Sequence, residues 1–454
     1  MGMSFEINEI LLDDIRNLIT SEDEKALLTL FEDVHHADVA EILDEVNWDE
    51  AVYLVRLLDS ETTSEALMEL DDDVRERLLE SLTPKEIAEE IEEMDTDDAV
   101  DAIAELDEQI QEAVISQIED EEHKADIREM LQYDEDSAGG LMAKELIKVK
   151  ETWTVAGCVR EMRRQAEEVT RVHSIYVVTK ENELLGRLSL KDLLTSKENA
   201  KIKEVYIPNV DYVHVNDDGE EVAKVMQKYD LEAIPVVDDD KKLLGRITID
   251  DMVDFIKEEA KEDYQLAAGI TQEVDSDDSI FQLTRARLPW LFLGLIGGIG
   301  AAAIMGGFER ILNEYTILFF YTPLIAAMAG NVGVQSSAII VQGLANDDVK
   351  GSIANRLIKE LALATLNGIL LGLALFAFTA LWYHDKPHNV TTALAISISL
   401  FAVIIMAGLI GTFIPLFLDK RGIDPAIATG PFITTSNDIF GILIYFWIAK
   451  LILF

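Results

Sequence analysis

Basic residues are scarce in this chain of 454 residues, which holds 38 Lys and Arg against 86 Asp and Glu and has a formal charge of −48. A surface that binds nucleic-acid phosphates has to be basic, so this deficit excludes a nucleic-acid-binding protein. The same negative charge would be repelled by anionic lipid headgroups. Cations are the partners that such a chain attracts.

Cysteine is almost absent as well. Cys158 is the single cysteine, which excludes an internal disulfide. The first ten residues, MGMSFEINEI, lack the basic and apolar regions of a secretion signal. Both features predict that the acidic part of the chain lies in a reducing cytosol.

Acidic and apolar residues are segregated along the chain. Residues 1–287 carry a charge of −47, whereas residues 288–454 hold only 9 acids and 8 bases. The second part contains five apolar runs, each long enough for the roughly 20 residues that a spanning helix needs. They are Leu288 to Phe308, Tyr315 to Leu344, Leu361 to Tyr383, Val390 to Leu418 and Pro425 to Phe454. The sequence therefore predicts a multidomain membrane protein with an all-α transmembrane domain of five helices at 286–454.

Basic residues in the loops predict the orientation of these spans. Seven bases flank the spans on one side, and three lie on the other: Arg310, Lys386 and Lys450. The positive-inside rule then places the N-terminus in the cytoplasm and the C-terminus outside, as an odd number of spans requires. We expect a multi-pass protein of the plasma membrane.

Residues 1–132 are expected to form an acidic, all-α superhelical domain. Apolar residues recur at intervals of three and four, as in Val74, Leu78, Leu79 and Leu82. Thr83–Glu86 has the pattern of a capping box with proline at the first helical position. Short helices in succession are typical of a superhelical array. His35 and His36 point about 100° apart on a helix, so a surface or capping role is preferred to a metal pair.

A second pattern is a repeat at an interval of 59 residues, because Ile175–Leu194 aligns without gaps to Ile234–Val253. Each copy predicts two strands around Leu-Leu-Gly-Arg and a helix that follows Ser189 or Thr248. The repeat resembles a tandem pair of α/β CBS domains, expected at 138–198 and 199–257. Such modules often bind adenine nucleotides. The alternative is a dimerising scaffold that carries a signal.

An acidic connecting helix and linker are expected at 258–285. The carboxylates that precede and open this segment are spaced three, four and four apart, which aligns them along one helical face: Asp251, Asp254, Glu258 and Glu262. Like charges at this spacing destabilise a helix unless cations lie among them. A solvated linker helix and a cation-responsive helix both fit the pattern.

One carboxylate interrupts the fifth apolar run. Asp438 lies 13 residues after Pro425 and 12 before Lys450, which places it near the bilayer midplane. An ionisable residue there is by default a pathway or ligand residue, and the alternative is a hydrogen-bonded core aspartate. Small and polar residues four, four and three apart share its helical face and can line a pore: Gly430, Thr434, Asp438 and Gly441.

The second apolar run carries Gly330–Ser337, in which glycines allow close approach of backbones and Asn331 offers an amide and an oxygen. Gly330 and Asn331 are candidate pore-lining residues, and close helix packing is the alternative. One carboxylate does not balance a divalent cation, whereas a two-fold axis would bring two copies of Asp438 together. This predicts a homodimer. Magnesium, which is usually held by one or two carboxylates with its water retained, suits such a site.

The order of acidic helical domain, CBS pair, acidic connector and five spans resembles the MgtE family of bacterial magnesium channels. The segments Gly330–Ser336, Asp424–Ala426 and Gly430–Gly441 carry the resemblance. It implies a homodimer with a pore between protomers and Asp438 as the ion-binding carboxylate, with the backbone near Thr434 contributing. Ala329 and Gly430 depart from the family, where Gly and Asn are common.

The resemblance also implies that cytosolic magnesium holds the connecting helix, called the plug, against the pore. The matching carboxylates are Asp251, Asp254, Glu259, Glu262 and Asp263 on the connector, Asp424 at the pore mouth, and Asp97 and Asp101 in the helical domain.

The sequence thus predicts a magnesium channel that mediates Mg²⁺ influx and closes by feedback. The rival hypothesis is a membrane-anchored CBS sensor of a cation or nucleotide that does not conduct. An enzyme is not expected, because the sequence shows no pairing of nucleophile and base and no phosphate-cradling loop.

Overall fold

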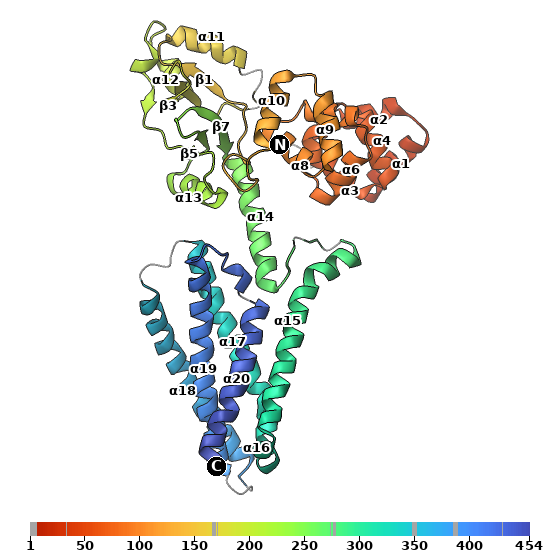
Figure 1. Ribbon diagram of the computed structural model, residues 1–454. Coiled ribbons are helices and arrows are strands. Elements are labelled where there is room, and N and C mark those ends of the chain that lie inside the picture. Colours follow the sequence, from red (N-terminus) through yellow and green to blue (C-terminus); the bar gives the residue numbers. More distant parts are fainter. Residues whose placement is uncertain are drawn as a thin grey trace. The chain divides into compact units, whose positions relative to one another are not determined.

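The computed structural model describes residues 7–32, 34–165, 169, 171–272, 274–275, 278–346, 352–384, 389–428 and 430–454. The start of the chain and Lys386, which entered the arguments on secretion and orientation, lie outside these residues. The chain divides into two compact units, Met1–Ile256 and Lys257–Phe454, which Figure 1 shows as ribbons.

Short helices follow one another through the first part of the first unit. Thr83 and Glu86 form the predicted capping box, in which Thr83 Oγ1 accepts from the Glu86 amide at 3.3 Å and Glu86 Oε2 accepts from the Thr83 amide at 2.6 Å. His35 caps a helix as predicted, since its Nδ1 accepts from the Ala37 amide at 3.3 Å. The helices within the described part of residues 7–132 are α1 (Glu9–Thr20), α2 (Glu24–Phe31), α3 (His36–Glu45), α4 (Trp48–Leu57), α5 (Ser60–Met68), α6 (Asp72–Glu80), α7 (Pro84–Ile91), α8 (Thr96–Ala104), α9 (Glu108–Gln117) and α10 (Glu121–Met130).

Two small sheets form the next part of this unit. The strands of the first, in the order β1-β2-β3-β4, are β1 (Ile147–Lys150), β2 (Ile175–Val178), β3 (Leu184–Leu188) and β4 (Ile207–Pro208), and those of the second are β5 (Val213–His214), β6 (Ala233–Val237) and β7 (Leu243–Thr248). In each sheet the first pair is parallel and the second antiparallel. The remaining helices here are α11 (Val155–Gln165), α12 (Leu190–Thr195), η1 (Ile202–Glu204) and α13 (Gly219–Tyr229).

The two hairpins confirm the repeat seen in the sequence. Hairpin β2–β3 pairs Ile175 with Leu188, and hairpin β6–β7 pairs Ile234 with Ile247 at the equivalent positions. Each hairpin has a register shift at the same place, before Val178 or Val237. The two hairpins therefore share the same pairing register.

A single helix, α14 (Ile249–Ala268), runs across the boundary between the units. It begins directly after Thr248, as predicted for the helix of the second repeat, and it contains the first part of the predicted connector, up to Ala268. The next helix, α15, begins at Ile280, eight residues before the first apolar run, because Ser279 and Gln282 form a capping box there.

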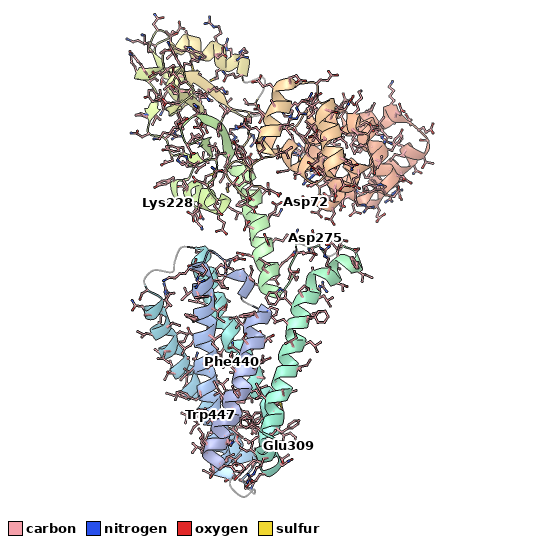
Figure 2. The ribbon with its side chains drawn as sticks, viewed as in Figure 1. Asp72, Lys228, Asp275, Glu309, Phe440 and Trp447 are labelled. Carbon is pink, nitrogen blue, oxygen red and sulfur yellow. The ribbon has the colours of Figure 1, made fainter. Side chains whose placement is uncertain are left out.

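Within its described residues, the second unit contains five helices that are long and apolar enough to cross a membrane, as predicted: α15 (Ile280–Gly307), α17 (Ile317–Ala345), α18 (Ile353–Trp382), α19 (Asn389–Asp419) and α20 (Gly430–Leu453). Two short pieces, α16 (Glu309–Glu314) and η2 (Ala426–Ala428), lie between them. Helix α19 packs against α17, α18 and α20. Large apolar side chains face outward, including Phe440 (48% exposed) and Trp447 (58% exposed) of α20 (Figure 2). The predicted fold class of a multidomain membrane protein is confirmed.

The start of the fifth span differs from the prediction. The apolar run begins at Pro425, but α20 begins at Gly430 because Asp424 and the 3₁₀ turn Ala426–Ala428 precede it. The Asp424 carboxylate accepts from the Ala426 amide at 2.8 Å and so stabilises this turn. Asp438 is therefore the ninth residue of a 24-residue helix, nearer to its start than its position in the apolar run indicated.

Candidate cation sites

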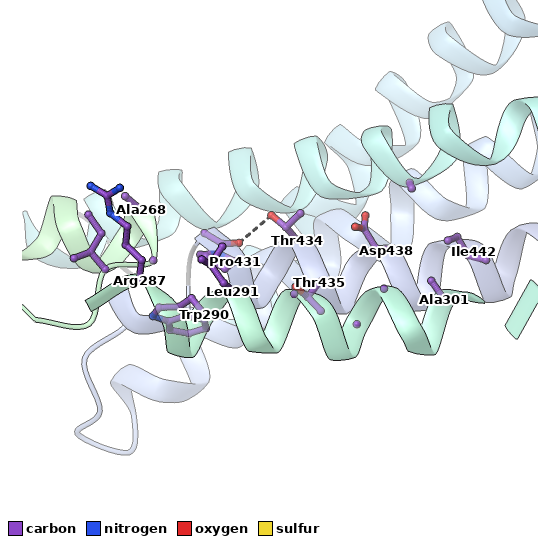
Figure 3. Close-up of a pocket in the computed structure, with 17 residues that line it drawn as sticks. Ala268, Arg287, Trp290, Leu291, Ala301, Pro431, Thr434, Thr435, Asp438 and Ile442 are labelled. Atoms are coloured by element: carbon purple, nitrogen blue, oxygen red, sulfur yellow. Dashed lines mark hydrogen bonds between the residues drawn. The ribbon is translucent and has the colours of Figure 1, made fainter. Parts of the chain in front are cut away.

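A pocket of about 880 Å³ lies in the second unit between α15, α17, α20 and the end of α14. Asp438 and Thr434 line it, one turn apart on α20, and point to the same side of that helix (Figure 3). Its lining residues are Ala268, Gly269, Ile270, Arg287, Trp290, Leu291, Gly294, Gly297, Gly298, Ala301, Ala326, Gly430, Pro431, Thr434, Thr435, Asp438 and Ile442. Among these residues Asp438 is the one acid, so the predicted carboxylate does face a cavity.

Helix α17 approaches this pair of residues through Gly330. A Cβ atom at Gly330 would lie 3.2 Å from Thr434 Cγ2 and 3.8 Å from Asp438 Oδ1, so the glycine brings α17 backbone against both side chains. Gly441 lies in a packing contact instead, because its Cβ would lie 3.0 Å from Ala329 Cβ. Asn331 is exposed on α17. Of the four predicted pore-lining residues only Gly430 is among the residues that line the pocket, whereas Gly330, Asn331 and Gly441 are not.

Gly430 lies against the end of α14. A Cβ atom there would collide with the carbonyl oxygen of Ala267. The contact is reciprocal, since Gly269 has a positive φ of 83° and a Cβ on it would collide with Pro431. Gly430 was predicted to line the pore and was also a departure from the family. It lines the pocket, and the structure gives a physical reason for the glycine: a side chain at this position would displace the end of α14.

Two further pocket residues were missed by the sequence analysis. Trp290 lines the pocket, and its Nε1 is buried without a hydrogen-bond partner among the described residues. Arg287 is one of the seven bases from which the orientation of the spans was predicted, and its side chain also lines the pocket (Figure 3). A tryptophan and an arginine near the start of a span are common interfacial anchors, so the sequence alone did not distinguish these roles.

The predicted carboxylates in the connector do not line the pocket. Glu262 is exposed on α14, whereas Glu259 and Asp263 are half-buried. The segment after α14 folds back on this helix, because the Gln265 side chain donates to the Val274 carbonyl at 2.7 Å and Lys261 pairs with Asp275 at 3.1 Å.

A separate acidic cluster lies in the first unit. Carboxylate oxygens of Asp95, Asp97 and Glu145 lie within 4.8 Å of one another, an arrangement that could hold a metal ion. The Thr96 hydroxyl donates to Glu145 Oε2 at 2.8 Å and accepts from the Lys144 amide at 2.8 Å, which joins α8 to the segment before β1. Oxygen ligands of this kind suit magnesium or calcium.

Burial and mutual repulsion make this cluster a costly place for negative charge. Burial, together with neighbouring carboxylates, raises the pKa of Asp95 to about 6, of Asp98 to about 7 and of Asp101 to about 8. The pKa of Asp97 is raised well above its ordinary value by burial and by the charges of Asp98 and Asp251. A divalent cation would offset this repulsion.

The charge of Asp251 acts on the predicted Asp97, whereas the predicted Asp101 is affected by the charges of Asp98, Glu135, Arg75 and Glu105. Asp254 is exposed on α14. The sequence analysis missed Asp95 and Glu145. Asp95 carries a local signal, since it precedes α8 two residues before Asp97, but Glu145 is 50 residues further on and has none.

These features define a class: a multi-pass membrane protein with an acidic helical domain, a CBS-like pair and carboxylate sites suited to divalent cations. The MgtE family, described as a divalent cation transporter, matches residues 322–448. The MgtE intracellular N domain matches residues 34–136, and the CBS domain matches 138–198 and 202–258.

Individual proteins agree with these matches. The magnesium transporter MgtE of Enterococcus faecalis is 37% identical over 327 residues, which cover 72% of this chain and 71% of that protein. The magnesium transporter MgtE of Thermus thermophilus is 35% identical over 334 residues, 73% of each chain. The chain belongs to the MgtE family.

Two solved structures resemble about half of the chain. The crystal structure of the soluble part of a magnesium transporter has a TM-score of 0.51 and 28% identity, and covers 56% of this chain and 99% of that chain. The cytosolic domain of the Mg²⁺ channel MgtE in complex with ATP also has a TM-score of 0.51, with 31% identity, and covers 54% of this chain and 99% of that chain.

Proposed function

We propose that this protein transports Mg²⁺ across the plasma membrane as a channel that mediates influx. The observation that carries the proposal is the pocket lined by Asp438 and Thr434, two side chains that Gly330 of α17 approaches closely, in a chain that belongs to the MgtE family. In this proposal the Asp438 carboxylate binds the ion and Thr434 contributes an oxygen ligand. Gly430 lets the end of α14 lie close against the start of α20. The N-terminus is cytoplasmic and the C-terminus extracytoplasmic.

The conducting form is proposed to be a homodimer. One Asp438 leaves a divalent cation half neutralised, whereas a two-fold axis supplies a second carboxylate. The outer surface of α15 is apolar and largely exposed, so lipid or a second copy of the chain can cover it. Asn331, exposed on α17, would then line the pore together with its counterpart from the second copy.

Gating is proposed to depend on cytosolic Mg²⁺. Ions at the Asp95, Asp97 and Glu145 cluster would favour a compact first unit. Further ions would be held by the remaining predicted carboxylates, which are Asp101, Asp251, Asp254, Glu259, Glu262, Asp263 and Asp424. The contact of Ala267 with Gly430 supports a closed state in which α14 ends on α20. Because the similar cytosolic domain of an MgtE channel was solved with ATP, we also propose that an adenine nucleotide binds the CBS pair.

Mg²⁺ uptake by liposomes that contain the purified protein tests the proposal. An inward Mg²⁺ gradient should give uptake that empty liposomes lack, measured with an internal magnesium dye. Absence of uptake at both low and high Mg²⁺ on the side of the first unit would favour the rival, a CBS sensor that does not conduct.

A further inference from the structure

Helix α18 carries a single carboxylate, Glu360, directly before its long apolar run. Glu360 Oε1 accepts a hydrogen bond from the Ser336 hydroxyl of α17 at 2.7 Å, and Ser336 is only 6% exposed. An ionisable group next to apolar membrane helices is costly unless it has a task. The transport pocket does not use this residue.

The third helix at this point is α19, which contributes Gly408. A Cβ atom on Gly408 would lie 2.8 Å from Glu360 Oε1, closer than such atoms pack. The glycine therefore leaves room for the carboxylate to reach from α18 past α19 to α17. Glu360 of α18 therefore contacts two other helices: it accepts a hydrogen bond from Ser336 of α17 and packs against Gly408 of α19.

Ser336 belongs to the same segment of α17 as Gly330, but it lies on another side of the helix. Six residues separate them, which at 3.6 residues per turn is a rotation of about 600°, or roughly 240° around the axis. Gly330 contacts Thr434 and Asp438, so Glu360 holds α17 from the side away from the pocket.

The segment between Gly330 and Ser336 has little freedom to adjust. A Cβ at Gly333 would collide with the Asn437 side chain of α20, and a Cβ at Gly411 of α19 would collide with the Gly333 carbonyl. Asn437 is fully buried and directly precedes Asp438. Because close-packed helices transmit strain, a small rotation or shift of α17 at Ser336 would also move Gly330 relative to Asp438.

We propose that Glu360 is a positioning residue for the cation site. Its hydrogen bond to Ser336 fixes the rotation and depth of α17, and thereby the distance between the Gly330 backbone and the Asp438 carboxylate. The inference rests on the proposed channel function. It predicts that Glu360 affects which cation passes, although the residue does not line the pocket.

The test compares four variants of the Glu360–Ser336 pair and one control variant with the wild type in the same liposomes. Glu360→Ala and Ser336→Ala remove the bond from either end, the double variant removes both groups, and Glu360→Gln keeps an oxygen acceptor of the same shape. Thr379→Val is the matched control. The Thr379 hydroxyl of α18 donates a hydrogen bond to the Tyr321 hydroxyl of α17 at 2.9 Å, so this substitution removes a different bond between the same two helices. The readouts are Mg²⁺ uptake, the ratio of Mg²⁺ to Ca²⁺ uptake, and the unfolding temperature of the detergent-solubilised protein.

We expect Glu360→Ala and Ser336→Ala each to lower Mg²⁺ uptake roughly tenfold and to lower the Mg²⁺ to Ca²⁺ ratio, with no further loss in the double variant. Glu360→Gln should recover most of the uptake. Thr379→Val should lower the unfolding temperature and leave the ratio unchanged. Glu360→Gln and Ser336→Ala are conservative, so they keep the test valid if Glu360→Ala does not fold.

Two results would overturn the positioning role. One is a normal cation ratio in both Glu360→Ala and Ser336→Ala, which would reduce the bond to a structural contact like that of Thr379. The other is loss of uptake in Glu360→Gln with normal uptake in Ser336→Ala, which would show that the charge acts without Ser336. A wild type that takes up no Mg²⁺ would instead refute the proposed function, and the positioning role with it.

Discussion

At the scale of single residues, Gly430 determines how closely the end of α14 approaches α20. Gly430→Ala would place a methyl group where the Ala267 carbonyl now lies, and α14 would have to move away. We expect this variant to conduct Mg²⁺ but to close poorly at high Mg²⁺ on the cytosolic side, measured as uptake into liposomes.

Gly306→Ala is the control for this substitution, because a Cβ at Gly306 would meet nothing within 4 Å. Its closure should match the wild type. Normal closure of Gly430→Ala would show that the contact between Ala267 and Gly430 has no part in gating.

Glu90 gives a prediction about pH. It is buried on α7, and burial raises the pKa of this carboxyl from 4.5 to about 7, although the Thr63 hydroxyl donates to it at 2.6 Å. Because folding favours the protonated form, this contribution to stability is complete below pH 4.5 and is lost as the pH rises through about 7. The loss is on the order of 3 kcal/mol.

Glu90→Gln should therefore stabilise the first unit at pH 8 and flatten its stability between pH 5 and 7. Amide hydrogen exchange in α7 would measure this in the whole protein. The exposed Glu41 supplies the control, Glu41→Gln, which should leave the pH profile unchanged. A wild type that becomes more stable across this range would contradict the assignment.

Residues with local signals were predictable, and residues whose role depends on a distant partner were not. A few neighbouring residues are enough to predict the capping box at Thr83 and Glu86. The same is true of Asp438, which is an acid within an apolar run. Gly430 acquires its role from Ala267, and Asp95 acquires its partner Glu145 from the fold. No short pattern connects such pairs.

At the scale of elements, apolar length predicted the five membrane helices but not where they begin. Helix α15 starts before its apolar run because a polar capping box extends it, and α20 starts after Pro425 because a 3₁₀ turn intervenes. Hydropathy reports the solvent around a helix, whereas its ends are set by hydrogen bonds. The domain boundaries drawn from the sequence stay predictions.

The five-span topology can be tested at the C-terminus. A cysteine added after Phe454 should react with a membrane-impermeant thiol reagent in intact cells, since the charge bias of the loops places this end outside. Cys158 is buried, so the native background should be low. Labelling only after the cells are opened would overturn the orientation, and with it the proposed direction of transport.

At the scale of the whole molecule, residues 1–287 carry a charge of −47, and we expect this acidic part to respond to divalent cations. Neutralising Asp251, Asp254, Glu259, Glu262 and Asp263 together should leave the channel open or poorly inhibited at high cytosolic Mg²⁺. In the unmodified protein, millimolar Mg²⁺ should protect residues 1–287 from proteolysis, because ions that bind the compact state shift the population toward it.

Monovalent salt at matched ionic strength is the control, since it screens charges without bridging carboxylates. Protection by salt alone would indicate screening in place of binding. If both proteolysis and closure are indifferent to Mg²⁺, the chain shares the architecture of its family but lacks feedback.

The measurement that tests the central claim most directly compares Mg²⁺ uptake by the wild type and by Asp438→Asn in the same liposome preparation, with the exposed Asp419→Asn as control. Asparagine keeps the size and polarity of the side chain and removes its charge. We expect uptake to fall by roughly tenfold or more, since about 1.4 kcal/mol of lost interaction suffices for a tenfold change. Uptake by Asp438→Asn at the wild-type rate and with the wild-type preference for Mg²⁺ would contradict the account, because the carboxylate would then not bind the ion.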